Sequence, residues 1–359
     1  MRVLVVNAGS SSLKLSLLDA DDATVAEREL AAPRARVDAG ELEAALRDAG
    51  MDAPDAVGHR VVHGGDHFHD AVVLDARVEA ALRELADLAP LHQGKSLAGV
   101  DAVGRLLPGV PAVACFDTAF HATLPDAAAT YALPAAWRER WNLRRFGFHG
   151  LSHAWVARRV PGERVVSCHL GAGASLCAIR DGRSVDTTMG FTPLEGLVMA
   201  TRSGNVDPGL VLWLLEHEGM ATGELADALE HESGLLGLAG TADLRAVLER
   251  AGDGDGPAQL ARDVYVHRLR AGIAAMAASL GGLDDLVFTG RAGERSAELR
   301  ALTAAGLAFL GVGIDDARNA QVSGDAEITA EGAATVRTHV VVAREDLEIA
   351  RQVRAALAS

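Results

Sequence analysis

The start of the chain has a continuous apolar run followed by a run in which apolar and polar positions alternate. Residues 3–6 form an apolar run rich in Val, and alternation follows at Leu13, Leu15 and Leu17. Two apolar runs joined by a short polar segment predict a β-hairpin over residues 3–18.

The turn of this predicted hairpin carries groups that suit a phosphate. Asn7, Ser10 and Ser12 bring backbone N–H groups and polar side chains to its tip, and Lys14 adds one positive charge. This set of groups matches phosphate oxygens. Ser and Gly are also common in ordinary turns, so a plain turn with a solvated lysine is the alternative.

A second segment repeats this plan about half a chain later. Residues 165–179 contain an apolar strand pattern, a turn with Gly171 and Gly173, and a second strand pattern. Two phosphate-type hairpins predict two related lobes that face one nucleotide. The arrangement resembles the two-lobed group of sugar kinases, actin and heat-shock chaperones, so we expect a duplicated α/β fold with an interlobe cleft.

The remaining pattern alternates between helix and strand periodicity. Helices are predicted at residues 41–49, 77–88, 258–281, 296–311 and 345–357, and strands at residues 56–65, 110–120, 286–289 and 339–343. Between the later elements, residues 186–209 form a long segment rich in Gly and Thr. Its apolar content argues against disorder, so we expect a functional loop.

Composition limits the partners that the chain can have. Its net charge of -15 at pH 7 argues against nucleic acid or an anionic membrane. An acidic surface also repels anionic substrates, so an anion site must be a local focus of Arg and Lys. The three cysteines have no CxxC spacing, which indicates a reducing compartment. Without a leader pattern or a run of about 18 apolar residues, we expect a soluble cytoplasmic protein.

Four side chains occupy positions that suit ligand contacts. Arg60 lies inside an apolar strand, where a guanidinium needs an anionic partner, and a structural salt bridge is the alternative. Asp117 lies near the end of the strand at residues 110–120, where open α/β sheets bind ligands. His149 lies between glycines just before the second hairpin, and Arg202 lies in the long loop.

Two further patterns favour a ligand site only weakly. His63, His67 and His69 crowd one loop, but no carboxylate or cysteine at regular ligand spacing supports a metal site. Residues 89–96 come within one residue of a Walker phosphate loop, with Ala89 in place of its first Gly. A true phosphate loop follows a strand, whereas a helix is predicted before this stretch.

Taken together, the motifs resemble the acetate kinase family over essentially the whole chain. They follow the order NAGSSSLK at 7–14, GHRVVHGG at 58–65, FDTAFH at 116–121, GFHGLSH at 147–153, HLGAG at 169–173, DTTMGFTPLEG at 186–196, TRSG at 201–204 and SGLLGLAG at 233–240. The resemblance implies a homodimer that transfers the γ-phosphoryl group of ATP reversibly to acetate, giving acetyl phosphate and ADP. We expect an N-terminal lobe at 1–147, with a helix at 346–359 packed on it, and a nucleotide-binding lobe at 148–345.

The resemblance also implies roles for individual residues. Asn7 and Glu345 would anchor Mg²⁺ or Mn²⁺. The reacting centre would contain Arg60, Asp117, His149 and Arg202. The acyl pocket would contain Val62, Leu91, Phe148 and Pro193, together with Arg60. The phosphate and nucleotide site would contain Ser10, Ser12, Lys14, His169, Gly171, Gly173, Asp243, Leu244, Arg245, Gly290, Arg291 and Gly293.

The chemistry of a carboxylate acceptor limits the role of Asp117. The acceptor is already ionised at pH 7, so it has no proton for a base to remove. Asp117 is therefore expected to orient the metal, through water, or Arg202. His149 is expected to donate a hydrogen bond to the phosphoryl oxygens as they gain charge.

The chain departs from the family pattern at several positions. Ala172 replaces an Asn, Gln93 and Gly94 replace an Asn-Pro pair, and Arg291 and Arg295 stand where relatives mostly have Gly and Asn. Pyrophosphate is therefore an alternative donor to ATP, and propionate or another short acyl group is an alternative acceptor. A nucleotide sensor without turnover is a third hypothesis. A sugar acceptor is disfavoured because it would need a general base and many hydroxyl partners.

Overall fold

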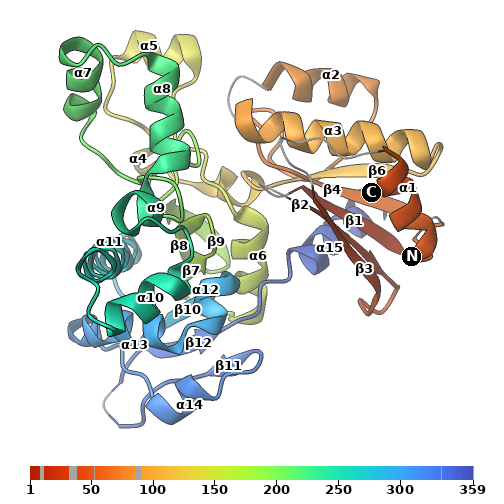
Figure 1. The fold of residues 1–359 in the computed structure, drawn as a ribbon. Coiled ribbons are helices and arrows are strands. Elements are labelled where there is room, and N and C mark those ends of the chain that lie inside the picture. Colours follow the sequence, from red (N-terminus) through yellow and green to blue (C-terminus); the bar gives the residue numbers. More distant parts are fainter. Residues whose placement is uncertain (9–11, 32–38, 52, 86–89, 333, 359) are drawn as a thin grey trace. The chain divides into compact units, whose positions relative to one another are not determined.

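The computed structural model describes residues 1–8, 12–31, 39–51, 53–85, 90–332 and 334–358, with only the backbone at 12, 39, 90–92 and 95. The chain divides into two compact units (Figure 1). Unit 1 contains residues 1–122, 148–155 and 344–359, and unit 2 contains residues 123–147 and 156–343.

This division differs from the single boundary expected between residues 147 and 148. The backbone N–H of Phe146 donates to the carbonyl of Gly190, which ties the 123–147 segment to unit 2. The N–H of Gly150 donates to the carbonyl of Asp117, which ties the 148–155 segment to unit 1. His149 therefore belongs to the first unit rather than to the second.

Unit 1 is built on a six-stranded sheet in the order β3-β2-β1-β4-β6-β5. The strands are β1 (Val3–Ala8), β2 (Ser12–Leu18), β3 (Thr24–Ala31), β4 (Ala56–Val61), β5 (Val72–Val73) and β6 (Ala112–Phe116). The helices are α1 (Ala39–Asp48), α2 (Ala76–Glu84), α3 (Pro90–Leu106) and α15 (Glu345–Ala358), with η3 (Ala119–Thr123) and α6 (Gly150–Arg159) extending past the unit boundaries. The first predicted hairpin is thus β1 and β2, and α3 occupies most of the Walker-like stretch.

Alternation along β1 sends its side chains to two separate cores. Leu4 and Val6 pack in one cluster with residues of α1 and α3, among them Leu42 and Val103. Val3 and Val5 pack in another cluster with Ile349, Ala350 and Val353 of α15. The sheet is therefore covered by helices on both faces, as its uninterrupted apolar strands predict.

Gly58 allows α15 to lie close against β4. A Cβ atom at this position would come 2.6 Å from Ile349 and 2.7 Å from Val353. A side chain there would push the helix away from the sheet. Glu345, the first residue of α15, therefore lies in the same unit as Asn7 and Arg60.

Unit 2 is built on a second six-stranded sheet, in the order β11-β12-β10-β7-β8-β9. The strands are β7 (Arg164–Leu170), β8 (Ala174–Arg180), β9 (Arg183–Thr187), β10 (Asp285–Thr289), β11 (Ala326–Glu327) and β12 (Arg337–Val340). The helical elements are α4 (Asp126–Ala129), α5 (Ala135–Trp141), α7 (Pro208–His217), α8 (Thr222–Asp227), η4 (Ala228–Glu232), α9 (Gly234–Ala239), α10 (Leu244–Gly252), α11 (Gly256–Leu280), α12 (Gly290–Arg295), α13 (Ala297–Ala305), η5 (Ala308–Leu310) and α14 (Asp316–Ala320).

The two sheets have the same topology. In each, the first three strands form an antiparallel meander, β1-β2-β3 in unit 1 and β7-β8-β9 in unit 2. The first strand of each meander also pairs in parallel with a fourth strand, β1 with β4 and β7 with β10. This fourth strand pairs in parallel with a fifth, β4 with β6 and β10 with β12. A short antiparallel edge strand, β5 or β11, completes each sheet. The duplication predicted from the two hairpins is therefore confirmed by strand order and direction.

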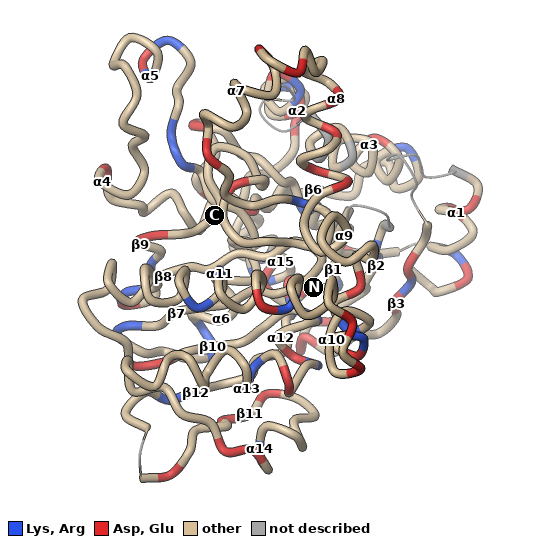
Figure 2. The backbone as a smooth tube through the Cα atoms, turned by 60° about the vertical axis from the view of Figure 1, so that its left-hand side comes forward, with Lys and Arg blue, Asp and Glu red and all other residues tan. Residues whose placement is uncertain are grey.

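Acidic residues are spread over the elements of both units rather than gathered in one segment (Figure 2). Among the residues that the structure describes, no helix has the length and apolar character needed to cross a bilayer.

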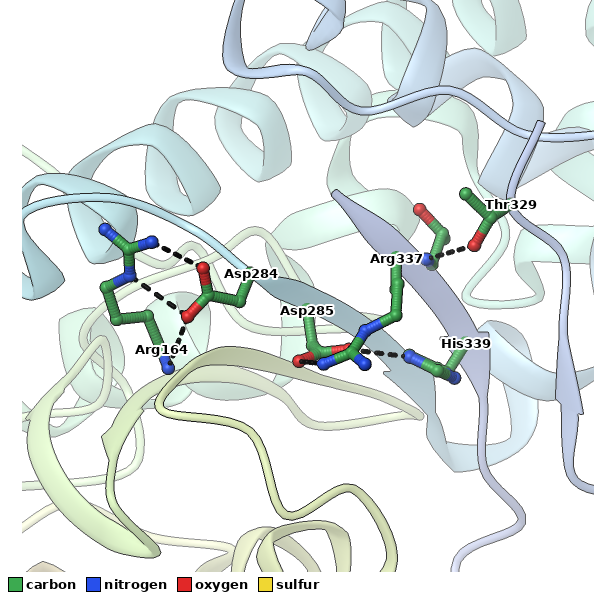
Figure 3. Close-up of polar contacts among 7 residues, drawn as sticks. Arg164, Asp284, Asp285, Thr329, Arg337 and His339 are labelled. Atoms are coloured by element: carbon green, nitrogen blue, oxygen red, sulfur yellow. Dashed lines mark hydrogen bonds and ion pairs between the residues drawn. The ribbon is translucent and has the colours of Figure 1, made fainter. Parts of the chain in front are cut away.

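A buried carboxylate joins the starts of the central strands in unit 2 (Figure 3). Asp285, at the first position of β10, is fully buried and accepts hydrogen bonds from Arg337 at 2.7 and 2.8 Å. Its Oδ1 also lies 2.8 Å from Nε2 of His339. Desolvation alone would raise the pKa of Asp285, but His339 and Arg337 outweigh it, and the pKa is lowered. Next to it, Asp284 forms a separate pair with Arg164.

Substituting Asp285→Asn is expected to destabilise unit 2 by about 2 kcal/mol at pH 7, because a buried amide cannot accept all the hydrogen bonds that the buried carboxylate accepts from Arg337 and shares with His339. Since the folded-state pKa is depressed, this stability is present above the unfolded value of about 3.9 and is lost as pH falls through the folded pKa. Urea unfolding at pH 7 and pH 3 should therefore differ less for the variant than for the wild type. Glu331→Gln, which breaks an exposed pair with Arg318, should cost under about 1 kcal/mol. An equal loss in both variants would contradict this interpretation.

Candidate active site

The centre of unit 1 is a hydrogen-bonded network around Arg60. Its Nε and Nη2 donate to Oδ2 of Asp117 at 3.0 and 2.6 Å, and its Nη1 donates to Oδ1 of Asn7 at 3.0 Å. Nδ2 of Asn7 donates in turn to Oε2 of Glu345 at 2.9 Å. The strand ends of β1, β4 and β6 and the start of α15 therefore meet at one guanidinium.

Strand register explains why Arg60 and Asp117 meet. Arg60 pairs with Cys115 across the parallel strands β4 and β6, and Asp117 follows the end of β6. The backbone N–H of Asp117 continues this pairing by donating to the carbonyl of Val61. Asp117 was expected to orient the metal or Arg202, whereas its carboxylate here holds Arg60.

Charge and burial act in opposite directions on this pair. Desolvation by burial lowers the pKa of Arg60, but the charges of Asp117 and Glu345 outweigh it and the pKa is raised. Burial raises the pKa of Asp117, and Arg60 opposes that shift. The side chain of Arg60 is 15 % exposed and that of Asp117 is 1 % exposed. Asp117 is therefore a buried counter-ion, with both oxygens held by Arg60.

Arg60 keeps donors for a further anion. Within the described part of the chain, its hydrogen bonds to Asp117 and Asn7 use three of the five guanidinium N–H groups. Two N–H groups remain, which matches the two-pronged recognition of a carboxylate or phosphate.

His149 is held next to Asp117 by its neighbour Gly150. The N–H of Gly150 donates to the carbonyl of Asp117 at 2.8 Å, and a Cβ at Gly150 would lie 2.2 Å from that oxygen. His149 has a φ of 57°, in the left-handed region that is unfavourable for a residue with a side chain. Strain of this kind costs on the order of 1 kcal/mol and is concentrated at functional sites.

Apolar residues in unit 1 accompany these polar groups. Phe148 is 1 % exposed and Val62 is 6 % exposed. The ring of His63 packs edge-on against Phe148 with centroids 5.6 Å apart. Burial lowers the pKa of His63 to about 4. The imidazole is therefore neutral at pH 7, and its Nδ1 accepts a hydrogen bond from the N–H of Gly65 at 2.8 Å.

Gln93 fixes the segment that contains Val62. Its side-chain amide accepts from the N–H of His63 at 3.1 Å and donates to the carbonyl of His63 at 3.0 Å. The side-chain amide of Gln93 thus pairs with the backbone of His63 as a neighbouring strand would. The sequence analysis noted Gln93 as a departure from the family pattern but did not predict this role.

The long loop of unit 2 carries Arg202 and Pro193. Nη1 of Arg202 donates to the carbonyl of Pro193 at 3.3 Å. Burial lowers the pKa of Arg202, and Glu230 partly opposes the shift. A cation in this setting gains stability when an anion binds beside it.

Gly234 in the SGLLGLAG motif supports the backbone of Arg202. The N–H of Leu235 donates to the carbonyl of Met199, and the N–H of Leu236 donates to the carbonyl of Ala200. Gly234 has a φ of 61°, and a Cβ there would lie 2.2 Å from the carbonyl oxygen of Met199. The SGLLGLAG motif therefore supports the loop that carries Arg202 through close backbone contacts.

The second hairpin and the segment after β10 also meet. His169 on β7 is paired with Thr289 on β10, and the turn at Gly171 and Gly173 follows β7. Gly290 has a φ of 75°, and a Cβ there would lie 2.8 Å from the carbonyl oxygen of Leu170. Gly290 and Gly293 are buried, whereas Arg291 is exposed. The carboxyl ends of β7 and β10 thus form one edge, where open α/β sheets bind ligands.

Comparison with known proteins agrees with these features. The Acetokinase family model matches residues 37–351. An acetate kinase from Nostoc punctiforme is 47 % identical over 306 residues, covering 83 % of this chain and 75 % of that protein. The crystal structure of Porphyromonas gingivalis acetate kinase has a TM-score of 0.89 at 34 % identity, and that of a propionate kinase from Francisella tularensis has a TM-score of 0.91 at 33 % identity. Each covers 99 % of both chains.

The chain belongs to the acetokinase family. The family, its α/β two-domain fold and the kinase class expected from the motifs are thereby confirmed.

Two cations expected at the phosphate and nucleotide sites, Lys14 and Arg245, form exposed ion pairs within the chain. The ammonium of Lys14 lies 2.5 Å from Glu27, and both side chains are half exposed. An exposed pair of this kind is worth about 0 to 1 kcal/mol, so a phosphate can displace it. Arg245 pairs with Glu249 and is 84 % exposed. Ser10 lies outside the described residues, as do the side chains of Ser12 and Leu91.

Asp243 and Leu244, expected in the nucleotide-binding segment, lie at the start of α10. Asp243 caps α10 by accepting the N–H of Arg245, and Leu244 is the first residue of that helix. The residues of unit 1 brought together are Asn7, Arg60, Asp117, His149 and Glu345. Those of unit 2 are grouped at two places, the Arg202 loop and the β7/β10 edge.

Proposed function

We propose that this chain transfers the γ-phosphoryl group of ATP reversibly to acetate, giving acetyl phosphate and ADP. The observation that carries the proposal is the setting of Arg60. Within the described residues, a guanidinium with two N–H groups not used by Asp117 or Asn7 lies in the same unit as the buried apolar residues Val62 and Phe148. A small carboxylate with a methyl group has these two halves, one charged and one apolar.

The chemistry follows from the charges of the reactants. An acetate oxygen forms a bond to the γ-phosphorus as the bond from that phosphorus to the β-bridging oxygen breaks, and ADP leaves. No proton has to be removed from acetate, and Asp117 is fully engaged with Arg60. Catalysis then consists of positioning and of neutralising negative charge, for which Arg60, Arg202 and His149 are the candidate groups.

The donor groups of unit 1 fit a divalent metal bound together with ATP. Among the residues described, no group of three or more His, Cys, Asp or Glu side chains could form a protein cage for a metal. Mg²⁺ is usually held by one or two carboxylates and by substrate phosphates. Glu345 would hold Mg²⁺ or Mn²⁺ in this way, and Asn7 would orient it through the 2.9 Å hydrogen bond. The bound metal would neutralise charge on the phosphoryl group as it transfers.

Two narrower alternatives share this site. Propionate adds one methylene, which a pocket of this kind discriminates by about 1 to 3 kcal/mol. Pyrophosphate is the alternative donor because the exposed Arg291 and Arg295 lie on α12, directly after β10. The acetate and ATP assignment is favoured because the buried apolar residues and the glycines at the β7/β10 edge are present.

The proposal is tested by trapping acyl phosphate with hydroxylamine. We expect acetyl hydroxamate from ATP and acetate, less product from propionate, and none from a sugar control. Arg60→Lys should lower kcat/KM at least a hundredfold, because an ammonium cannot hold Asp117 and the anion in one plane. Arg318→Lys, at an exposed pair, is the matched control and should stay within twofold. Turnover with pyrophosphate but not ATP would contradict the donor, and no product with any pair would favour a sensor.

A second test concerns the contact between Gly150 and Asp117. Gly150→Ala places a Cβ against the Asp117 carbonyl oxygen, so we expect kcat to fall more than tenfold as His149 and Asp117 move apart. Gly104→Ala in α3 meets no atom within 4 Å and should leave kcat unchanged while raising stability slightly. Equal kcat values in the two variants would show that this contact does not position His149.

We also propose that the protein pairs with a second copy through α7. This helix contains Leu210, Leu212 and Trp213 at 48, 56 and 46 % exposure and buries none of its residues within its own unit. An apolar helix without a buried face is typical of an interface between subunits.

Sedimentation should therefore give a dimer for the wild type and a monomer for Leu212→Asp. Leu260→Asp is a matched control, because Leu260 is also 56 % exposed but lies on α11. A dimer that survives Leu212→Asp, or that is lost equally in both variants, would contradict the α7 surface.

We further propose a reducing compartment, the cytoplasm, for this protein. All three cysteines are buried free thiols. Burial raises the pKa of Cys177 to about 12, which keeps it a protonated and unreactive thiol.

A further inference from the structure

The loop that carries Arg202 has little regular structure of its own. After β9 ends at Thr187, residues 188–207 contain neither a helix nor a strand until α7 begins at Pro208. A segment of this length keeps one conformation only when side chains from elsewhere hold it. Arg202 cannot present its guanidinium reproducibly unless this loop is fixed.

Arg145 holds the beginning of the loop. Its Nη1 donates to the carbonyls of Thr188 and Met189 at 3.2 and 2.9 Å, and its Nη2 donates to Oε1 of Glu195 at 2.6 Å. The side chains of Arg145 and Glu195 are 17 and 31 % exposed. One guanidinium thus joins two parts of the loop.

Tyr131 holds the other oxygen of Glu195. Its hydroxyl donates to Oε2 of Glu195 at 2.5 Å and accepts the N–H of Phe191 at 2.9 Å. Burial and then the hydrogen bond to Glu195 raise the pKa of Tyr131, so the phenol stays a proton donor at neutral pH. Arg145 also stacks over the ring of Tyr131 at 5.6 Å.

Gly190 leaves the space in which these groups meet. A Cβ at this position would lie 1.7 Å from Oε2 of Glu195 and 2.2 Å from the Tyr131 hydroxyl. The carbonyl of Gly190 accepts the N–H groups of Phe146 and Gly147 at 3.1 and 3.2 Å. The loop is therefore tied to the 145–147 segment by backbone as well as by side chains.

Tyr131, Arg145 and Glu195 form a side-chain clamp on the loop, and two sets of hydrogen bonds connect this clamp to Arg202. Pro193, two residues before Glu195, accepts a hydrogen bond from Nη1 of Arg202. Gly196, the residue after Glu195, exchanges hydrogen bonds with Asn205 at 2.8 and 3.0 Å and so closes the short loop that contains Arg202. Displacing Glu195 would move both the carbonyl that contacts Arg202 and the base of its loop.

We infer that Tyr131, Arg145 and Glu195 are positioning residues for Arg202. They act on substrate only through the loop. The inference rests on the proposed function, because it assumes that the anion beside Arg202 is a reactant.

The test compares Glu195→Gln and Tyr131→Phe with a matched control, Asp284→Asn. Asp284 also binds a partly buried arginine of unit 2, with side chains of Arg164 and Asp284 at 36 and 29 % exposure, but at the start of β10. We expect kcat/KM for acetate to fall at least tenfold in Glu195→Gln and about fivefold in Tyr131→Phe, with the KM for ATP within twofold of wild type. Asp284→Asn should lower the melting temperature but keep both constants within twofold.

Hydrogen exchange of the amides at 188–203 gives a readout that does not need turnover. It should rise at least tenfold in Glu195→Gln and stay unchanged in Asp284→Asn. Unchanged exchange in Glu195→Gln, or faster exchange with unaltered acetate kinetics, would overturn the inference. Wild-type protein that makes no hydroxamate would contradict the proposed function, while the exchange comparison would still decide whether the clamp orders the loop.

Discussion

The ion pair between Arg60 and Asp117 is the constraint on which the first unit depends. A guanidinium that is 15 % exposed would be costly to bury alone, and a carboxylate that is 1 % exposed would be costlier still. Each charge lowers the free-energy cost of burying the other. The parallel pairing of β4 with β6 brings the two side chains together. Asn7 and Glu345 extend the network to β1 and α15, so folding of the unit and assembly of the anion site are one event.

Close backbone contacts, more than specific side chains, determine the shape of both units' sites. Gly150 against Asp117, Gly234 against Met199 and Gly290 against Leu170 all lie where a Cβ would come within 3 Å of a carbonyl oxygen. Two of them also have positive φ angles. Each glycine allows two backbone segments to lie in direct contact, at the end of β6 for Gly150, at the end of β7 for Gly290 and within the 188–207 loop for Gly234.

The sequence carried enough information for the fold but only part of the site. The apolar run at Val3 to Val6 and the alternation at Leu13 to Leu17 predicted β1 and β2, and the repeat of that pattern at 165–179 predicted the duplicated topology. The structure divides the units differently from the single boundary expected, because hydrogen bonds such as that from Phe146 to Gly190 connect distant segments and leave no trace in periodicity. Arg60 and Asp117 were each selected from strand position, yet their mutual contact was not, because partner choice depends on strand register.

Tyr131, Arg145 and Glu195 were missed for a related reason. They are separated by up to 64 residues in the chain, and each looks like an ordinary surface residue when taken alone. Gly190 is the one signal that could have led to them, since it lies in a motif that had already been singled out. A glycine whose missing Cβ leaves room for neighbouring side chains indicates where such side chains meet.

The placement of α15 has a consequence for biosynthesis. Residues 344–359 complete the first unit, yet the ribosome makes them after every residue of the second. Until they emerge, one face of the first sheet lacks Ile349, Ala350 and Val353, and Asn7 lacks the carboxylate of Glu345. A nascent chain that stops before α15 therefore exposes an apolar sheet face that chaperones and proteases can recognise, and its anion site is complete only after α15 has been made.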